Sequence, residues 1–188
     1  VYHRTVYNGD AAPSFLSIAQ DDDPLVVVNG FSKAWAMTGW RVGWMVAPRR
    51  MVVQMAALAE CFNTGANVFA QAGAIAALEG GEATVRELRA QYQRGREITV
   101  DILGQEPAIQ LTTPVAAFYA FPRIEHLDSS RRFAEQLLAK HDVGVAPGYT
   151  FGPGNERHIR ICFAQSHERL AEGLHRLLTF VREQGGGG

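Results

Sequence analysis

No charge of one sign dominates this sequence, and it has no long apolar run. The formal net charge of its 188 residues is −1, and its arginines are scattered rather than gathered into a basic stripe. Such a chain has no general attraction to nucleic acid or to anionic lipid. Gly, Asn or a charged residue breaks every apolar run well short of the about 18 residues that span a membrane. We therefore expect neither a nucleic-acid partner nor a membrane partner.

Cysteine is scarce, and the common metal and nucleophile motifs are missing. Cys61 and Cys162 lie far apart without CxxC spacing, which favours reduced thiols and a cytoplasmic protein. The histidines are scattered, with no HExxH motif and no Cys/His cluster at zinc spacing. The patterns G-x-S-x-G and GxxxxGK[ST] do not occur. We expect no metal site, no nucleophilic serine elbow and no P-loop.

Lysine is almost absent although arginine is plentiful, Lys33 and Lys140 being the only two lysines. Lys33 follows a β-branched run and the turn Asn29-Gly30, and large apolar residues surround it in the sequence. Burial of an unpaired ammonium is costly, so an amine in this position needs a reason. A lysine amine can lose its proton and form a Schiff base, which a guanidinium cannot. The composition therefore indicates a chemical role for the Lys33 amine.

Arg41 lies eight residues after Lys33 and directly precedes a second apolar run, Val42–Val46. Its planar guanidinium suits a phosphate better than a second lysine would. The same residues are compatible with a simpler interpretation, in which both cations extend their stems along a core hairpin and keep their charges in water. The residue types alone leave both interpretations open.

The order of residues in this stretch is more specific than their types. Ser32-Lys33, followed by Met37-Thr38-Gly39-Trp40-Arg41-Val42-Gly43, resembles the pyridoxal-phosphate lysine motif of the class I/II aminotransferases, the fold-type I family. The resemblance implies that Lys33 is the catalytic residue and holds pyridoxal 5'-phosphate as an internal aldimine. It implies that Arg41 binds the cofactor phosphate. Gly30 departs from the pattern, because many members have a phosphate-binding serine there.

The first residues resemble a second motif of this family. Val1-Tyr2 matches the end of its Asp-Glu-Val-Tyr motif, which precedes the lysine by a similar interval. The resemblance implies that the Tyr2 hydroxyl hydrogen-bonds the phenolic oxygen of the cofactor, whereas Tyr2 without the resemblance is more typical of an aromatic residue at a strand end. The aspartate that pairs with the pyridine nitrogen would then fall before Val1. We therefore expect the chain to be the C-terminal half of such an enzyme.

A third resemblance lies near the C-terminus, where the loop Pro147–Gly152 precedes the run Arg160-Ile161-Cys162-Phe163-Ala164. Together they are similar to the substrate signature of the family. On this match Arg160 binds the α-carboxylate of the amino acid through a bidentate pair. By itself, an arginine in an alternating strand is also typical of an outward-facing salt-bridge partner, and Arg157 is a near neighbour of similar type.

Apolar periodicity alternates between strand and helix along the chain, which predicts an α/β fold. The runs 25–28 and 42–46 are continuous and apolar, as in strands of a sheet buried on both faces. Shorter strands are expected at 2–7, 117–121, 143–145 and 159–163, and helices at 48–62, 68–78, 82–103, 131–140 and 166–181.

The resemblance divides this α/β fold into two parts. Residues 1–95 are expected to be the second half of the fold-type I large domain, which binds the cofactor and has a mixed sheet with flanking helices. Residues 96–184 are expected to form a small C-terminal α+β domain, and residues 185–188 a flexible glycine tail.

The resemblance also implies a function, namely pyridoxal-phosphate-dependent transfer of an amino group between an amino acid and a 2-oxo acid in a cytoplasmic homodimer of amino acid metabolism. Two alternatives stay open. The same scaffold supports β-lyases, because the cofactor chemistry diverges after the carbanion. It also serves as a non-catalytic effector domain in some transcription regulators, which bind the cofactor without turnover.

Overall fold

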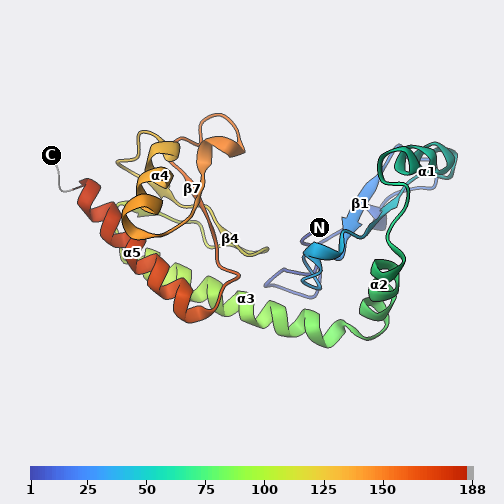
Figure 1. Ribbon diagram of the computed structural model, residues 1–188, viewed down its shortest axis with the longest axis horizontal. Coiled ribbons are helices and arrows are strands. Elements are labelled where there is room, and N and C mark those ends of the chain that lie inside the picture. The colour runs from blue at the N-terminus through green and yellow to red at the C-terminus, as the bar shows by residue number, and fades with distance from the viewer. Residues whose placement is uncertain (186–188) are drawn as a thin grey trace. The chain divides into compact units, whose positions relative to one another are not determined.

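The computed structural model describes residues 1–185, and the chain divides into two units (Figure 1). Unit 1 runs from Val1 to Arg89 and unit 2 starts at Ala90, so the division falls within helix α3, Glu82–Leu103. The domain boundary expected after residue 95 falls in the same helix and stays a prediction. Of the expected glycine tail, Gly185 is instead the last residue of helix α5, and residues 186–188 lie outside the described part of the chain.

Unit 1 contains a β-hairpin followed by two helices. Strand β1, Val27–Gly30, pairs antiparallel with β2, Gly43–Val46, in a register that sets Gly30 opposite Gly43. At Gly43 the two backbones come so close that an added Cβ would lie 2.5 Å from the Asn29 carbonyl oxygen, so a side chain does not fit there. The other elements are the 3-10 helices η1 (Phe15–Ser17) and η2 (Thr38–Trp40) and the helices α1 (Arg49–Asn63) and α2 (Val68–Gly80).

Local sequence explains where α1 and α2 begin. Pro48 directly precedes α1, where its fixed φ suits a helix start and its missing N–H costs nothing. The Asn67 side chain caps α2, because its carbonyl oxygen accepts hydrogen bonds from the backbone N–H groups of Phe69 (2.9 Å) and Ala70 (3.4 Å). Both helices lie within a residue or two of the ranges predicted from apolar periodicity.

Two expectations for unit 1 are wrong. The runs 25–28 and 42–46 do form strands, but all of β2 is exposed and Val28 is 66% exposed, so this sheet is not buried on both faces. Among the described residues the sheet consists of β1 and β2 alone. The segment 2–7 contains a turn at His3 and Arg4, closed by a hydrogen bond from the Thr5 N–H to the Tyr2 carbonyl oxygen (2.9 Å), and a single bridge residue at Val6 instead of a strand.

The segment between β1 and β2 packs against α2. Burial recurs at Phe31, Ala34 and Met37, and Phe31 and Met37 form a small core with Ala74 of α2. Lys33 lies between the buried residues Phe31 and Ala34 in the sequence and is itself half-buried. The packing therefore holds the loop that carries the predicted site.

Unit 2 contains two small antiparallel sheets covered by helices. Strands β4 (Tyr119–Ala120), β7 (Ile159–Cys162) and β6 (Ala146–Pro147) form one sheet in the order β4-β7-β6. Strands β3 (Ile109–Gln110) and β5 (Arg123–Ile124) form the other. Helices α4 (Ser130–His141) and α5 (His167–Gly185) and the 3-10 helix η3 (Gly148–Phe151) complete the unit. Its core includes Leu103, Leu137, Ile159, Phe163, Leu177 and Phe180.

The α/β alternation is confirmed, but two strands of unit 2 differ from their predicted ranges. Ala117 has a φ of +61°, a left-handed conformation that does not fit a strand, and β4 begins only at Tyr119. The strand expected at 143–145 is wrong, because pairing with β7 occurs at Ala146 and Pro147 instead. Pro147 has no N–H to donate and is the last residue of β6.

Three further observations concern membrane-spanning helices, metal-binding groups and cysteine thiols among the described residues. None of their helices is long and apolar enough to cross a membrane. No group of three or more His, Cys, Asp or Glu side chains among them is placed to hold a metal ion. Cys61 and Cys162 are both exposed free thiols.

Candidate active site

The loop from Ser32 to Arg41 carries the two predicted cofactor cations of unit 1. Its backbone contains two non-glycine residues with left-handed dihedrals, Ala36 (φ +54°) and Arg41 (φ +52°). Each such residue costs free energy, and conformations of this kind concentrate at functional sites. The packing of Phe31 and Met37 maintains the strained loop.

A pair of hydrogen bonds closes this loop around Thr38. The Thr38 hydroxyl donates to the carbonyl oxygen of Ser32 (3.1 Å), and the Arg41 guanidinium donates to the carbonyl oxygen of Thr38 (2.8 Å). The second bond engages one of the five N–H donors of the guanidinium. The two bonds therefore tie Arg41 to the residue that precedes Lys33.

Lys33 lies against Tyr2. Its Nζ atom is 6.0 Å from the centre of the Tyr2 ring, although 31 residues separate the two in the sequence. The next residue, His3, holds this N-terminal segment to β1 through a 3.0 Å contact between its Nδ1 atom and the Asn29 side-chain nitrogen. Burial, the N-terminal ammonium and Arg4 lower the pKa of His3, which favours a neutral ring that accepts this hydrogen bond.

A broad hollow of unit 1 opens beside this loop. Gly30, Ser32 and Arg41 line it from the hairpin side, and Asn63 and Asn67 line it from the turn between α1 and α2. Lys33 is not among its lining residues, although Ser32 beside it is. The structure thus brings Arg41 to the hollow and Lys33 to Tyr2. Neither Asn63 nor Asn67 was predicted as a site residue, because the residue types of Asn63-Thr64-Gly65 by themselves indicate a helix interruption.

Arg160 lies on β7 in unit 2, and its guanidinium packs against two aromatic rings. Its Cζ atom is 4.4 Å from the ring centre of Tyr119 and 4.5 Å from that of Phe151. Within the described part of the chain its guanidinium has no ion pair, unlike the outward-facing salt-bridge partner that was the simpler interpretation. The neighbouring Arg157 side chain is exposed and does not share this setting.

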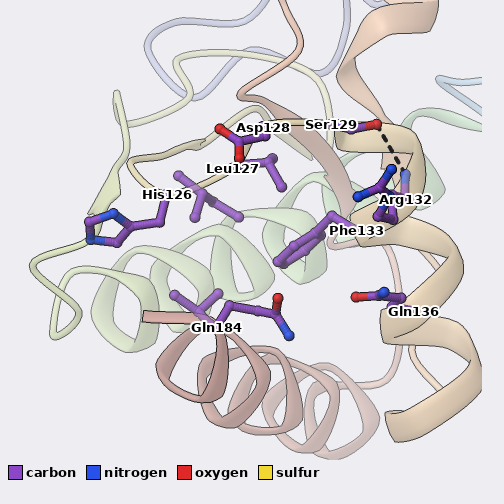
Figure 2. Close-up of a pocket in the computed structure, with 10 residues that line it drawn as sticks. His126, Leu127, Asp128, Ser129, Arg132, Phe133, Gln136 and Gln184 are labelled. Atoms are coloured by element: carbon purple, nitrogen blue, oxygen red, sulfur yellow. Dashed lines mark hydrogen bonds between the residues drawn. The ribbon is translucent and has the colours of Figure 1, made fainter. Parts of the chain in front are cut away.

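Unit 2 contains a cavity of about 130 Å³, and Arg160 does not line it (Figure 2). The sticks of Figure 2 show residues from the β5–α4 connection, from α4 and from the end of α5, among them Ser129, whose hydroxyl caps α4 by accepting from the Arg132 N–H (3.4 Å). None of the residues predicted for the site lines this cavity.

Comparison with known proteins identifies the family. The family model described as aminotransferase class I and II matches residues 1–177. The chain is 39% identical over 155 residues to the aspartate aminotransferase of Pyrococcus horikoshii, covering 81% of this chain and 40% of that protein. It is 35% identical over 187 residues to aromatic-amino-acid aminotransferase 2 of Thermococcus litoralis, covering 98% of this chain and 48% of that protein.

Solved structures agree with these relatives. The aromatic aminotransferase from Pyrococcus horikoshii superposes with a TM-score of 0.90 at 32% identity, covering 98% of this chain and 50% of that one. The aspartate aminotransferase from Thermotoga maritima gives a TM-score of 0.85 at 30% identity, with 97% and 46% covered. The chain spans about half the length of the relatives and structures that it matches. On the family match and these likenesses, the chain belongs to the class I and II aminotransferases.

Proposed function

We propose that the protein is a pyridoxal-phosphate-dependent aminotransferase, which moves an amino group between an amino acid and a 2-oxo acid. The observation that carries the proposal is the loop Ser32–Arg41, which holds the Lys33 amine against the Tyr2 ring and sets Arg41 on a hollow, in a chain of the aminotransferase family. The relatives reported above are named aminotransferases, which favours transfer over β-elimination or a non-catalytic effector domain.

The residues of unit 1 fit pyridoxal phosphate by their chemistry. Lys33 supplies a primary amine, which can bond to an aldehyde carbon, and Tyr2 beside it supplies a phenol. Arg41 supplies a guanidinium with a single hydrogen bond to Thr38, and Ser32 also lines the hollow. A guanidinium and a hydroxyl at one hollow form a donor set suited to a phosphate.

The proposed mechanism assigns one role to each of these side chains. When bound, pyridoxal phosphate draws electrons from the α-carbon of the amino acid. The Lys33 amine would hold the cofactor covalently and, once released, would take the proton from the α-carbon as general base and deliver it to the cofactor as general acid. Arg41 holds the phosphate, and the Tyr2 hydroxyl donates a hydrogen bond to the phenolic oxygen. Arg160 holds the substrate α-carboxylate through its paired N–H groups.

The proposal extends to the architecture of the whole enzyme. Residues 1–95 belong to its cofactor-binding large domain and residues 96–184 form its small C-terminal α+β domain. The separation of the chain into two units within α3 supports this division. The enzyme is a cytoplasmic homodimer that acts on an amino acid and a 2-oxo acid. Membership of the class I and II family supports these assignments.

One assay separates the candidate activities. The protein is supplied with pyridoxal phosphate, a panel of amino acids that includes aspartate and phenylalanine, and 2-oxoglutarate. Formation of glutamate from 2-oxoglutarate supports the proposed transfer. Release of ammonia and pyruvate from serine or cysteine without glutamate would identify a β-lyase. Cofactor binding with neither product would identify an effector domain.

A further inference from the structure

Two aromatic rings pack against the Arg160 guanidinium. Tyr119 of β4 and Phe151 at the end of η3 place their ring centres 4.4 and 4.5 Å from its Cζ atom. These distances are typical of a cation stacked on aromatic faces. Phe151 itself meets the edge of Phe121 (5.5 Å, 84°), and Phe121 stacks on His158 (4.9 Å, 9°). The ring against Arg160 is therefore supported by a row of further rings.

The backbone fixes both of these rings. Tyr119 pairs with Cys162 in the β4–β7 ladder, which makes it a diagonal neighbour of Arg160 across the two strands. Phe151 ends η3, where Gly152 turns the chain with a φ of +108°. The Asn155 side-chain amide donates to the carbonyl oxygens of Phe151 (3.1 Å) and Gly152 (3.3 Å) and so holds this turn.

A guanidinium that packs against aromatic rings binds an anion through the N–H groups along its edge. No carboxylate of the described residues pairs with this edge in Arg160. A carboxylate makes its bidentate pair in the plane of the guanidinium, so the plane that the rings impose is the plane in which the carboxylate must arrive.

We propose that Tyr119 and Phe151 are positioning residues for the carboxylate subsite: by packing against Arg160 they fix the orientation of its guanidinium before substrate binds. The inference rests on the proposed function, in which Arg160 holds the substrate α-carboxylate. A side chain that is already ordered has less rotamer freedom to lose when it binds, and the rings thereby increase the affinity of Arg160 for a carboxylate.

The test uses variants that remove one ring and matched variants that keep it. Phe151→Leu and Tyr119→Leu each remove one of the two aromatic rings, whereas Phe151→Tyr and Tyr119→Phe retain both rings. Tyr149→Leu is the control, because Tyr149 lies in the same 3-10 helix as Phe151 and is similarly exposed (42% against 40%). Since Phe151 is partly exposed, its leucine variant is expected to fold even if Tyr119→Leu does not.

The first readout needs no turnover. Propionate, a carboxylate without an amine, is titrated while NMR follows the Nε–Hε signal of Arg160, which is assigned by its loss in Arg160→Lys. We expect the Kd for propionate to rise about threefold to tenfold in the two leucine variants, as for one side chain that must be immobilised again on binding. The ring-keeping variants and Tyr149→Leu should match the unmodified protein. Equal Kd values in Phe151→Leu and Tyr149→Leu, or no response of Arg160 to propionate, would overturn the inference.

The second readout is the KM for the amino acid in the transfer assay. We expect it to rise by the same factor in the leucine variants while kcat changes by less than about twofold, because the rings act through carboxylate binding alone. If the unmodified protein transfers amino groups and Phe151→Leu has the KM of Tyr149→Leu, the inference fails and the proposed function stands. If no transfer occurs but the propionate affinities rank as expected, the proposed function fails and the positioning role of the rings stands.

Discussion

Thr38 donates its hydroxyl hydrogen to the carbonyl oxygen of Ser32, 3.1 Å away. Its own carbonyl oxygen accepts a 2.8 Å hydrogen bond from the Arg41 guanidinium. One threonine thus connects the residue before the proposed catalytic amine to the proposed phosphate ligand. The order of the motif, in which Thr38 stands between Lys33 and Arg41, has a structural reason in this closed loop.

Removal of the Thr38 hydroxyl should weaken cofactor binding. In Thr38→Val the bond to Ser32 is lost, and the loop that presents Arg41 is less ordered. We expect the Kd for pyridoxal phosphate to rise about threefold to tenfold, as for the loss of one partly exposed hydrogen bond. Thr38→Ser keeps the hydroxyl and should bind as the unmodified protein does. An absorbance titration of all three proteins measures this, and equal affinities for the valine and serine variants would contradict the role assigned to Thr38.

The substitution Arg41→Gly should change the affinity for pyridoxal phosphate without a large change in the free energy of unfolding. Glycine adopts the left-handed conformation of Arg41 (φ +52°) without strain, so Arg41→Gly should keep the free energy of unfolding within about 1 kcal/mol of the unmodified protein. Loss of the guanidinium should nevertheless weaken pyridoxal phosphate binding by about tenfold or more. Ala36→Gly is the matched control, because it relieves a similar dihedral (φ +54°) without removing a ligand.

Denaturant unfolding and cofactor titration together decide this point. If Ala36→Gly loses as much cofactor affinity as Arg41→Gly, the loop geometry rather than the guanidinium would account for binding. If Arg41→Gly binds pyridoxal phosphate normally, Arg41 is not its phosphate ligand.

The ion pair between Arg182 and Glu106 should make unit 2 sensitive to acid. The Arg182 Nε–H donates to Glu106 (2.7 Å), whose side chain is only 11% exposed, and this hydrogen bond holds the pKa of Glu106 below its usual range. A lowered pKa in the folded state stabilises it above the ordinary glutamate pKa of about 4.3, and this contribution is lost as the pH falls through the folded pKa.

Arg182→Gln should therefore lower the free energy of unfolding by about 1 kcal/mol at neutral pH, with the difference shrinking toward about pH 3. Arg131→Gln is the control, since Arg131 and Glu135 form an exposed pair on α4 that should contribute little at any pH. Urea unfolding across this pH range measures both variants. A deficit in Arg182→Gln that does not change with pH would refute the electrostatic account.

The helices of this chain could be predicted because their apolar periodicity is local. The range expected for α3, 82–103, agrees with the structure, and so does the buried leucine face of α5. The exposure of β2 and of Val28 in β1 could not be predicted. A continuous apolar run is typical of a buried strand, but it does not show whether other elements are present to cover that strand. The late start of β4, at Tyr119 instead of Ala117, is related to the left-handed dihedral of Ala117, which its residue type does not reveal.

The site was predictable only in part, for a related reason. The Lys33 motif could be read from the chain because its residues are close together in sequence. The approach of Lys33 to Tyr2, the lining of the hollow by Asn63 and Asn67, and the stacking of two rings on Arg160 all depend on tertiary packing. The roles of Tyr2, Lys33, Arg41 and Arg160 stay predictions until a bound cofactor or substrate is observed.

The most direct test of the account is to locate the covalent bond to the cofactor. The protein is incubated with pyridoxal phosphate, reduced with borohydride and digested, and its peptides are weighed by mass spectrometry. Because this sequence holds two lysines, a labelled side-chain amine within it belongs to Lys33 or to Lys140. The account predicts the cofactor mass on the Lys33 peptide, its loss together with the visible absorbance of the bound cofactor in Lys33→Arg, and its retention in Lys140→Arg. Label on Lys140 instead, or label and absorbance that persist in Lys33→Arg, would contradict it.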